Sequence, residues 1–251
     1  MLTNQRKQHI LTILKRDGQV VAKVVSQELG LSEDTIRRDL RELAQEGLLQ
    51  RVHGGALPAS PAIANFTQRE DIGIESKVAI GRAAAQLVKE GQVVMLDGGT
   101  TAVQVARHLP HNLEATIVTH SARIVMELVD APHIEVILIG GRLFKHSIVS
   151  VGAAAIEAIS HIRADLYFMG VTGIHPVAGL STGDHEEAYV KQALCRQAAE
   201  TIVLASREKL GAASQYVITS LSEVSGMIVE RDTSDEVLLP YVERGLTIWR
   251  A

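Results

Sequence analysis

The sequence lacks several features that would place it in a specialised class. Cys195 is the single cysteine in 251 residues, which excludes an intrachain disulfide and argues against a cysteine-based zinc site. Aromatic residues make up only 3% of the chain, so aliphatic side chains must dominate the packing of its core. No apolar run reaches the length of a membrane span, and we expect no N-terminal signal sequence. We therefore expect no membrane partner.

Acidic and basic residues are unevenly distributed along the chain. The formal net charge of −4 does not suggest nucleic-acid binding by the chain as a whole. Residues 1–56, however, hold nine Lys or Arg against seven Asp or Glu, a net charge of +2 that leaves −6 for the remainder. The length, with 46% hydrophobic residues, allows two domains. A weakly basic module on an acidic body is consistent with DNA binding by the first part only.

Residues 32–47 have the periodicity of a short amphipathic helix. Ser32 can accept a hydrogen bond from the first helical N–H groups, and Gly47 can adopt the left-handed conformation that ends a helix. The apolar face carries Ile36, Leu40 and Leu43, and the polar face carries Asp34, Arg37, Arg38, Arg41 and Gln45. Such a helix fits a DNA major groove, although taken alone it is equally compatible with an ordinary solvated surface helix.

The flanking residues favour the DNA-binding interpretation. A helix is expected over 3–16, and a second over 22–29 that buries Val24, Val25 and Leu29 and ends at Gly30. The β-capable residues and paired glycines of 48–56 suit a small hairpin. Helix, short turn and helix followed by a hairpin form a winged helix-turn-helix, which we assign to residues 1–56. The candidate DNA contacts are Ser32, Thr35, Arg37, Arg38, Arg41, Arg51 and His53.

Residues 57–76 lose this pattern and are interpreted as a linker. From residue 77 to residue 251, helical and short apolar segments alternate, which predicts a mainly parallel sheet with helices on both faces. Helices are expected over 77–90, 102–109, 121–129, 153–159 and 186–199. Strands are expected over 93–96, 115–118, 134–139, 166–171, 202–205, 216–219 and 227–229. Sheets of this kind bind ligands beyond the carboxyl ends of their strands.

Three polar turns follow three successive strands. Glycines allow close backbone approach, threonine hydroxyls donate hydrogen bonds, and a helix N-terminus offers free N–H groups to an anion. Each turn alone is also compatible with a purely structural connection, but three in succession at one sheet edge favour a binding site. The turns are Asp97-Gly98-Gly99-Thr100-Thr101, Thr119-His120-Ser121, and Gly140-Gly141-Arg142.

Further candidates lie around the start of the 186–199 helix. Asp184 and Glu187 suit the positive end of the helix dipole, and could also bind sugar hydroxyls. Lys191, one turn later, and Lys209 could face a phosphate. The Asp184-His185-Glu186-Glu187 run is the best metal candidate, but adjacent helical residues point in different directions, so we expect neither a metal nor a cofactor.

The N-terminal motifs resemble those of the DeoR family of bacterial transcriptional regulators. The resemblance rests on Ser32, Thr35-Ile36-Arg37-Arg38-Asp39-Leu40, Leu43, Gly47 and Arg51-Val52-His53-Gly54-Gly55-Ala56, and it continues through the second domain. It implies an effector-sensing α/β domain similar in fold to ribose-5-phosphate isomerase and CoA-transferase proteins. In that family the three turns line a pocket for phosphorylated metabolites.

This chain departs from the family pattern at two places. His120 replaces the usual asparagine of the second turn, whereas Asp97, Gly99, Thr100 and Thr101 match the first turn. Near the end, the family's Asp-x-Ser-Lys-Phe-Gly is replaced by Ser206-Arg207-Glu208-Lys209-Leu210-Gly211. The added carboxylate of Glu208 would alter the hydrogen bonding around a sugar phosphate.

The resemblance implies a DNA-binding transcriptional regulator located in the cytoplasm. We expect a repressor of carbohydrate or related metabolite genes, controlled by a phosphorylated sugar, polyol or sugar acid. One recognition helix covers few base pairs, so a homo-oligomer, either a dimer or a tetramer, should bind double-stranded operator DNA. The alternative is an enzyme of the sugar-phosphate isomerase class with a fused DNA module. No paired acid and base is fixed by the sequence, so we expect no enzymatic activity and assign no catalytic residue.

Overall fold

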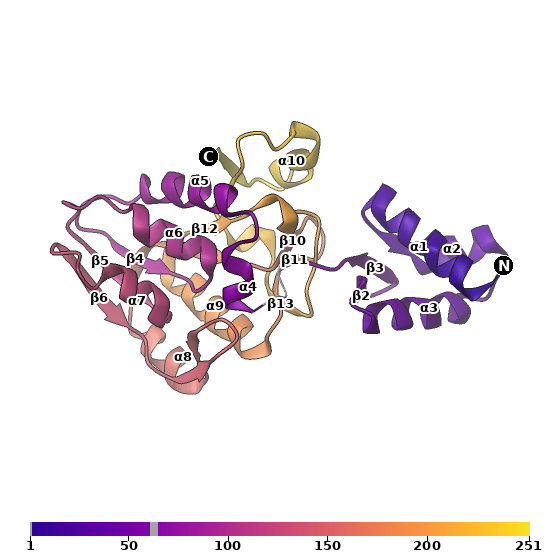
Figure 1. Cartoon of the computed structure of the whole chain (residues 1–251), viewed down its shortest axis with the longest axis horizontal. Helices are drawn as coiled ribbons and strands as arrows, with labels where there is room; N and C mark the ends of the chain where they lie inside the picture. The colour runs from indigo at the N-terminus through magenta and orange to yellow at the C-terminus, as the bar shows by residue number, and fades with distance from the viewer. Residues whose placement is uncertain (1, 61–64) are drawn as a thin grey trace.

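The computed structural model describes residues 2–60 and 65–251, and within them the chain forms two parts with separate cores (Figure 1). The smaller part, indigo in Figure 1, contains three helices and a three-stranded sheet of order β1-β3-β2. Its elements are α1 (Thr3–Asp17), β1 (Val20–Val21), α2 (Ala22–Leu29), α3 (Glu33–Gln45), β2 (Leu49–Val52) and β3 (Gly55–Pro58). This is the winged helix-turn-helix arrangement that the sequence predicts.

Local sequence signals account for the ends of α3. The Ser32 hydroxyl accepts a hydrogen bond from the Thr35 N–H at 3.2 Å, and Gly47 has a φ of 74° directly after the helix. Ile36, Leu40 and Leu43 are buried against α1 and α2, as their spacing predicts. One expectation for α2 is wrong. Val24 is 57% exposed, because the helix turns Val25 inward and leaves its neighbour facing solvent.

A buried ion pair joins α3 to α1. Arg6 Nη2 donates to Asp39 Oδ1 at 2.8 Å and Arg6 Nε donates to Asp39 Oδ2, which makes the pairing bidentate. Both side chains are almost fully removed from solvent, and the hydrogen bond to Asp39 raises the pKa of Arg6 above its usual value. Asp39, inside the arginine-rich motif, therefore fixes the recognition helix rather than facing outward with its neighbours.

The larger part is built on a parallel seven-stranded sheet of order β15-β14-β12-β9-β4-β5-β6. The chain first winds outward through β4, β5 and β6, then returns to the other side of β4. The order therefore reverses between β4 and β9, a point where open α/β sheets bind ligands. The strands are β4 (Val93–Leu96), β5 (Ala115–Thr119), β6 (Ile134–Leu138), β9 (Ala164–Gly170), β12 (Ala198–Leu204), β14 (Gly226–Val229) and β15 (Thr247–Arg250).

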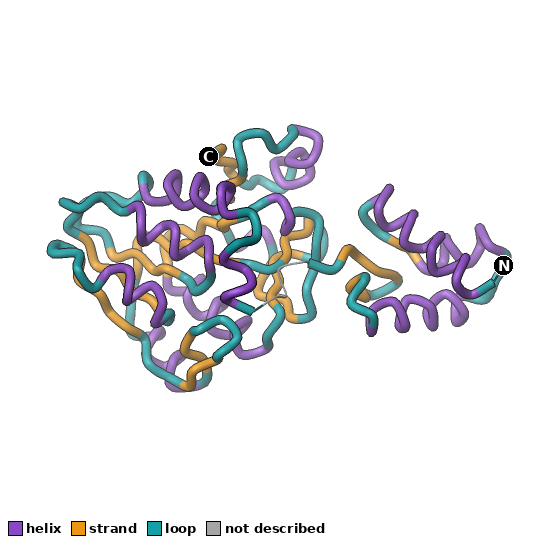
Figure 2. The backbone as a smooth tube through the Cα atoms, viewed as in Figure 1, coloured by secondary structure: helices purple, strands orange, loops and turns teal. Residues whose placement is uncertain are grey.

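Helices cover both faces of this sheet (Figure 2), and strand side chains alternate between the two. In β4, Val94 and Leu96 pack against the side of α5 (Ile74–Ala85), α6 (Thr100–His108) and α7 (Ala122–Leu128), whereas Met95 packs on the opposite side. The opposite side is covered by α8 (Ala153–Ser160), α9 (His185–Gln197) and α10 (Asp235–Val242). Gly81 allows α5 to approach α6 closely, since a Cβ there would lie 2.5 Å from the Gln104 Cβ.

Several elements of the larger part differ from the sequence expectations. The strand at 216–219, β13 (Tyr216–Thr219), belongs to a small separate sheet with β10 (Gly173–His175) and β11 (Gly179–Thr182). A hairpin of β7 (Arg142–Phe144) and β8 (Val149–Val151), the helix α10 and the edge strand β15 were not expected. Short 3-10 turns occur at η2 (Arg207–Lys209) and η3 (Leu221–Glu223). The strands β7, β8, β10 and β11 are only three or four residues long, too short to give a periodic signal.

The stretch interpreted as a linker contains ordered structure on both sides of residues 61–64, which lie outside the described residues. The Pro58 carbonyl at the end of β3 accepts a hydrogen bond from Ala213 N at 3.1 Å, and Ala59 forms a parallel bridge with Ala213. Farther on, the short helix α4 (Phe66–Glu70) places Phe66 in the core beneath α5 and α6. The structure therefore attaches the start and the end of this stretch to the larger part.

Replacing Asp39 with alanine should loosen the winged helix-turn-helix, because Arg6 would be left buried without its partner. Removing one member of a buried pair costs about 3–5 kcal/mol. Hydrogen–deuterium exchange of the full-length protein should show faster exchange of α1 and α3 amides in Asp39→Ala. The control, Asp34→Ala, removes an exposed carboxylate from the first turn of the same helix and should change exchange little. Equal exchange in the two variants would show that the pair does not stabilise this domain.

Candidate functional site

The exposed face of α3 carries three arginines. Arg37 is paired with Glu33 one turn earlier, at 2.7 Å, whereas none of the ion pairs among the described residues involves Arg38 or Arg41. All three guanidinium groups reach solvent from one helix. The Ser32 hydroxyl caps that helix and lies 2.9 Å from the Thr35 hydroxyl, so both residues also stabilise its start.

The wing lies against the same helix. A groove between α3 and the β2–β3 hairpin is lined by Arg37 together with Arg51 and His53 of the wing. Gly54, with a φ of 79°, forms the turn of the hairpin. This arrangement brings three cationic or ionisable side chains to one edge of the domain, where a phosphate backbone could lie between helix and wing.

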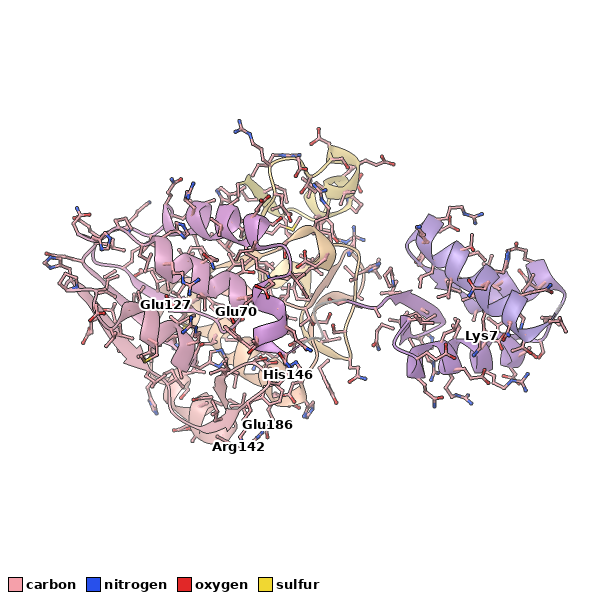
Figure 3. The ribbon with its side chains drawn as sticks, viewed as in Figure 1. Lys7, Glu70, Glu127, Arg142, His146 and Glu186 are labelled. Carbon is pink, nitrogen blue, oxygen red and sulfur yellow. The ribbon has the colours of Figure 1, made fainter. Side chains whose placement is uncertain are left out.

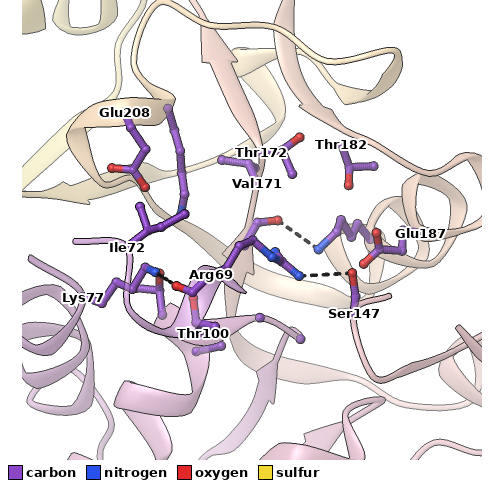
Figure 4. Close-up of a pocket in the computed structure, with 17 residues that line it drawn as sticks. Arg69, Ile72, Lys77, Thr100, Ser147, Val171, Thr172, Thr182, Glu187 and Glu208 are labelled. Atoms are coloured by element: carbon purple, nitrogen blue, oxygen red, sulfur yellow. Dashed lines mark hydrogen bonds between the residues drawn. The ribbon is translucent and has the colours of Figure 1, made fainter. Parts of the chain in front are cut away.

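A second hollow occurs in the larger part, at the reversal point between β4 and β9. It encloses about 620 Å³ of free space, counting space open to solvent. Figure 4 shows its walls converging from elements far apart in sequence. Four cations line it, namely Arg69, Lys77, Lys191 and Lys209, with two acids, Glu187 and Glu208. The lining also includes the turn from Gly98 to Ala102, the residues Ile72, Gly170 and Val171, and the hydroxyl-bearing residues Ser147, Thr172 and Thr182. We call this space the cationic cavity.

The floor of the cationic cavity is organised by Asp97, whose side chain is fully buried. Its Oδ1 accepts hydrogen bonds from Gly98 N at 2.8 Å and from His120 Nε2 at 2.9 Å. Its Oδ2 accepts from Gly170 N at 2.8 Å and from Lys191 Nζ. Burial alone would raise the pKa of Asp97, but the positive charge of Lys191 and the hydrogen bond from His120 hold it well below its usual range. Asp97 is therefore a carboxylate that fixes the site.

The second predicted turn lies below the cavity rather than in its wall. His120 Nδ1 lies 2.9 Å from the Ser150 carbonyl oxygen and its Nε2 lies 2.9 Å from Asp97 Oδ1, so the ring bridges β8 and the Asp97 turn. Thr119 Oγ1 donates to the Leu96 carbonyl at 2.7 Å and accepts from Ser121 N at 3.1 Å. These three residues are buried and none is among the residues lining the cavity. Their observed role is to hold the sheet edge together.

The N-terminus of α6 opens directly into the cationic cavity. Gly99 precedes the helix with a φ of 106°, a conformation that glycine adopts readily. The first N–H groups of a helix have no intrahelical acceptor and carry the positive end of its dipole. The hydroxyls of Thr100 and Thr101 accompany these groups in the lining. An anion is the ligand that this end of the cavity can best satisfy.

The cations around the cavity are crowded and poorly hydrated. Burial, together with the positive charges of Lys77 and Arg69, lowers the pKa of Lys209 to about 8 against the opposing effect of Glu208. Burial also lowers the pKa of Lys77 and of Arg69. Lys77 Nζ donates to the Arg69 carbonyl, and Lys209 Nζ donates to the Leu204 carbonyl at 3.3 Å. An incoming anion would relieve the mutual repulsion of these side chains.

Some predicted binding residues lie away from the cavity. Arg142 is exposed and pairs with Glu186 on the surface (Figure 3), and neither it nor Gly141 lines the cavity. The third turn runs into the β7–β8 hairpin, which carries Arg142 outward. Asp184 caps α9, accepting from the N–H groups of Glu186 and Glu187 at 3.0 Å each. It lines a smaller neighbouring hollow instead.

The sequence interpretation missed several residues that the fold brings to the cavity. Arg69 and Lys77 were missed because residues 57–76 were interpreted as a linker and Lys77 as the start of a surface helix. Thr182 lies two residues before the candidate Asp184, so the cluster predicted at the start of the 186–199 helix could have signalled it. No periodic or motif signal marks Ser147 or Thr172. Gly98, Gly99, Thr100, Thr101, Glu187, Lys191 and Lys209 are the candidates that the cavity brings together.

The described residues lack two further features. They contain no group of three or more His, Cys, Asp or Glu side chains placed to hold a metal ion. In the same residues, no helix is long and apolar enough to cross a membrane.

Comparison with protein families decides the affiliation of the chain. A model described as the DeoR-like helix-turn-helix domain matches residues 6–61, and one described as the DeoR C terminal sensor domain matches residues 73–231. The chain belongs to the DeoR family. The family and the α/β fold class predicted from the sequence are thus confirmed.

Full-length relatives carry regulator names. The regulator GlpR of Haloferax volcanii is 36% identical, covering 94% of this chain and 95% of its own. The repressor GlcR of Bacillus subtilis is 33% identical, over 92% and 90% of the two chains. The glycerol-3-phosphate regulon repressor of Escherichia coli is 29% identical, over 92% of each. This DeoR family member is a DNA-binding transcriptional regulator.

Solved structures with a similar fold are more distant. The sorbitol operon regulator SorC from Klebsiella pneumoniae aligns over 95% of this chain and 98% of its own, with 12% identity and a TM-score of 0.42. A ribose 5-phosphate isomerase from Methanocaldococcus jannaschii aligns over 53% and 52%, with 20% identity and a TM-score of 0.39. Both TM-scores are too low to support a conclusion about this chain.

Replacing Arg38 with alanine should weaken binding to an operator fragment selected from random duplexes by the wild-type protein. Loss of a base contact should cost ~1–3 kcal/mol of discrimination, whereas loss of a phosphate contact should reduce the salt slope by about one unit. Titrations at several salt concentrations distinguish the two. The control Lys89→Ala removes an exposed cation from the larger part. Unchanged affinity and salt slope in Arg38→Ala would remove Arg38 from the interface.

Proposed function

We propose that this regulator is a repressor of carbohydrate or related metabolite genes, released from its operator by a phosphorylated sugar, polyol or sugar acid. The supporting observation is the cationic cavity, where four cations surround the free N-terminus of α6. The names of the relatives, among them a glycerol-3-phosphate regulon repressor, support the same class of effector. DNA is contacted by α3 and the wing, through the seven residues named from the sequence.

The two ends of the cavity suit two parts of such an effector. At the α6 end, backbone N–H groups, threonine hydroxyls and Lys209 match a phosphate dianion. Toward α9, the carboxylate of Glu187 and the hydroxyl of Thr182 can hydrogen-bond sugar or polyol hydroxyls. Glu208 also lines the cavity and accepts a hydrogen bond from the Ser206 hydroxyl at 2.6 Å. That carboxylate partly offsets the positive charge of Lys77 and Lys209.

The same cavity is proposed to sense rather than catalyse. Proton abstraction requires a base that can approach the substrate, and Asp97 instead lies fully buried among four hydrogen-bond donors. Lys191 is likewise engaged by Asp97 and by the Gly170 carbonyl at 3.0 Å. Assays of isomerisation of pentose and hexose phosphates test this directly. Turnover that survives purification and is lost in Lys191→Met would favour the enzyme alternative.

We further propose that the regulator acts as a homo-oligomer, a dimer or a tetramer, because two half-sites are needed for useful operator specificity. The edge of the main sheet offers a surface for a second copy. β6 is an edge strand, and large apolar side chains on and beside it are exposed. They are Met126, Val129, Ile137, Leu138 and Leu143.

Effector binding should weaken as the pH rises above about 8. Anion binding favours protonated Lys209, whose pKa is about 8, so affinity is retained below that pH and falls as the lysine loses its proton. Below about pH 6, the phosphate itself takes up a proton and loses charge. Calorimetric titration of the wild type with glycerol 3-phosphate, glucose 6-phosphate and ribose 5-phosphate measures this. Lys209→Met should bind more weakly and lose the decline above pH 8. A wild-type affinity that is flat between pH 7 and pH 10 would contradict this placement of the phosphate.

Replacing Leu138 with arginine should shift the protein toward monomer in sedimentation velocity and weaken operator binding, because it places a charge in the proposed contact. Val177→Arg is the matched control, since Val177 is 81% exposed on the turn between β10 and β11. A wild type that sediments as a monomer at micromolar concentration, with and without operator, would be incompatible with the proposal.

A further inference from the structure

The segment between the two family matches contributes two side chains to the cationic cavity, Arg69 and Ile72, of which only Arg69 is charged. Arg69 lies on α4, between the helix-turn-helix match that ends at residue 61 and the sensor match that begins at residue 73. It is therefore outside both recognised domains. It nevertheless lines the cavity and the smaller hollow beside it.

The fold holds α4 firmly over the cavity. Asn65 caps the helix by accepting from Gln68 N at 3.0 Å, and Phe66 is buried in the core shared by α5 and α6. Phe66 N donates to the His146 carbonyl at 2.9 Å, which ties α4 to the loop between β7 and β8. Lys77 Nζ donates to the Arg69 carbonyl. The guanidinium is thus delivered to the cavity by a defined helix, which is attached to the sensor at both ends.

The guanidinium of Arg69 is only partly hydrogen-bonded within the described residues. Its Nη2 donates to Ser147 Oγ at 3.3 Å, while its Nε is buried and has no hydrogen-bond partner within the described chain. Figure 4 shows Arg69 extended between Lys77 and Ser147, across the middle of the cavity. A guanidinium has five N–H donors arranged to bind two oxygens of a phosphate or carboxylate at once. A buried donor without an acceptor, beside the free N-terminus of α6, is satisfied by an anion entering the cavity.

The other end of the same segment is also attached to the cavity wall. The Ser60 hydroxyl donates to the carbonyl of Thr172, and Thr172 lines the cavity. Residue 60 follows β3 by two positions, and β3 is the central strand of the wing sheet. The chain that leaves the DNA module therefore touches the cavity at Thr172 and enters it at Arg69.

We propose that Arg69 binds the anionic group of the effector and that this contact couples the cavity to the DNA module. The inference rests on the proposed function, since it assumes an anionic effector in this cavity. Effector binding draws Arg69 from Ser147 toward the anion and so sets the position of α4. Such binding changes operator affinity only if the effector prefers one arrangement of the segment, and Arg69 supplies that preference.

The alternative is that Arg69 only holds the β7–β8 loop in place through Ser147. That loop contains Ile148, with a φ of 56°, a conformation that β-branched residues rarely adopt. Ser147→Ala removes the loop contact and leaves Arg69 free to bind an anion. Arg69→Gln removes the charge and keeps a side chain of similar length. The two variants separate anion binding from loop support.

The test uses full-length wild type, Arg69→Gln, Ser147→Ala, Lys209→Met and the surface control Lys89→Ala. Each is titrated with inorganic phosphate, glycerol 3-phosphate, glucose 6-phosphate and ribose 5-phosphate, and operator affinity is measured with and without each compound at saturation. For compounds that bind the wild type, Arg69→Gln should weaken binding by ~10- to 100-fold, the loss expected for a charged hydrogen bond. It should also lower the effector-induced change in operator affinity several-fold. Lys89→Ala should stay within about twofold of wild type. Ser147→Ala removes one lining hydroxyl but keeps the guanidinium of Arg69, so its loss should be clearly smaller than that of Arg69→Gln.

Three results would overturn the proposal. In the first, Arg69→Gln binds and responds like wild type while Lys209→Met is weakened, which refutes the role of Arg69 and leaves the proposed effector class intact. In the second, Ser147→Ala reproduces the losses of Arg69→Gln, which makes Arg69 a support for the loop. In the third, no compound binds the wild type or changes its operator affinity, which refutes the phosphorylated effector and this inference together.

Discussion

The sensor part depends on one buried carboxylate. Asp97 receives hydrogen bonds from β4's own turn, from the end of β9, from Lys191 of α9 and from His120 after β5. Strands β4 and β9 are the pair at which the sheet reverses its order, so they have no short connection to fix the distance between their ends. If either Asp97 or Lys191 lost the other, the remaining side chain would be a buried charge without compensation. The complete set instead holds open the space above it, where the α6 N-terminus and the cations face each other.

A comparable device stabilises the DNA module, where Asp39 and Arg6 join the recognition helix to α1. In both parts, one acidic residue of a sequence motif is buried and stabilises the fold, whereas the neighbouring residues of the motif face the proposed ligand. Asp39 lies among arginines that point outward, and Asp97 lies below glycines and threonines that line the cavity. Each motif thus contains a buried acidic residue that holds the backbone in place and neighbouring residues that are positioned to contact the ligand.

The sequence was sufficient to predict the family, the winged helix-turn-helix and most strands of the parallel sheet, because apolar periodicity and glycine turns are local signals. The error at Val24 shows where local periodicity fails, since two adjacent valines in a short helix give no indication of which one faces inward. Arg142 was misplaced because a hairpin follows Gly141, and strands of three residues carry no periodic signal. Arg69 and Lys77 could not be assigned to the cavity, because Lys209 lies more than 130 residues farther along the chain. Only the fold of the whole domain brings these side chains together, and no local sequence pattern records it.

The junction at Ala59 has a geometric consequence for DNA recognition. The wing strand β3 and the bridge to Ala213 are consecutive stretches of one extended backbone, so the wing sheet has almost no slack relative to the sensor. Helix α3 packs on the same core as the wing, so we expect it to follow any movement of the wing. A small rotation at Ala59 therefore swings the whole recognition helix through an arc rather than displacing single contacts. In the proposed oligomer, bound to a duplex whose half-sites repeat every ~34 Å, such an arc would change the distance between the two recognition helices, which no single side-chain contact could restore.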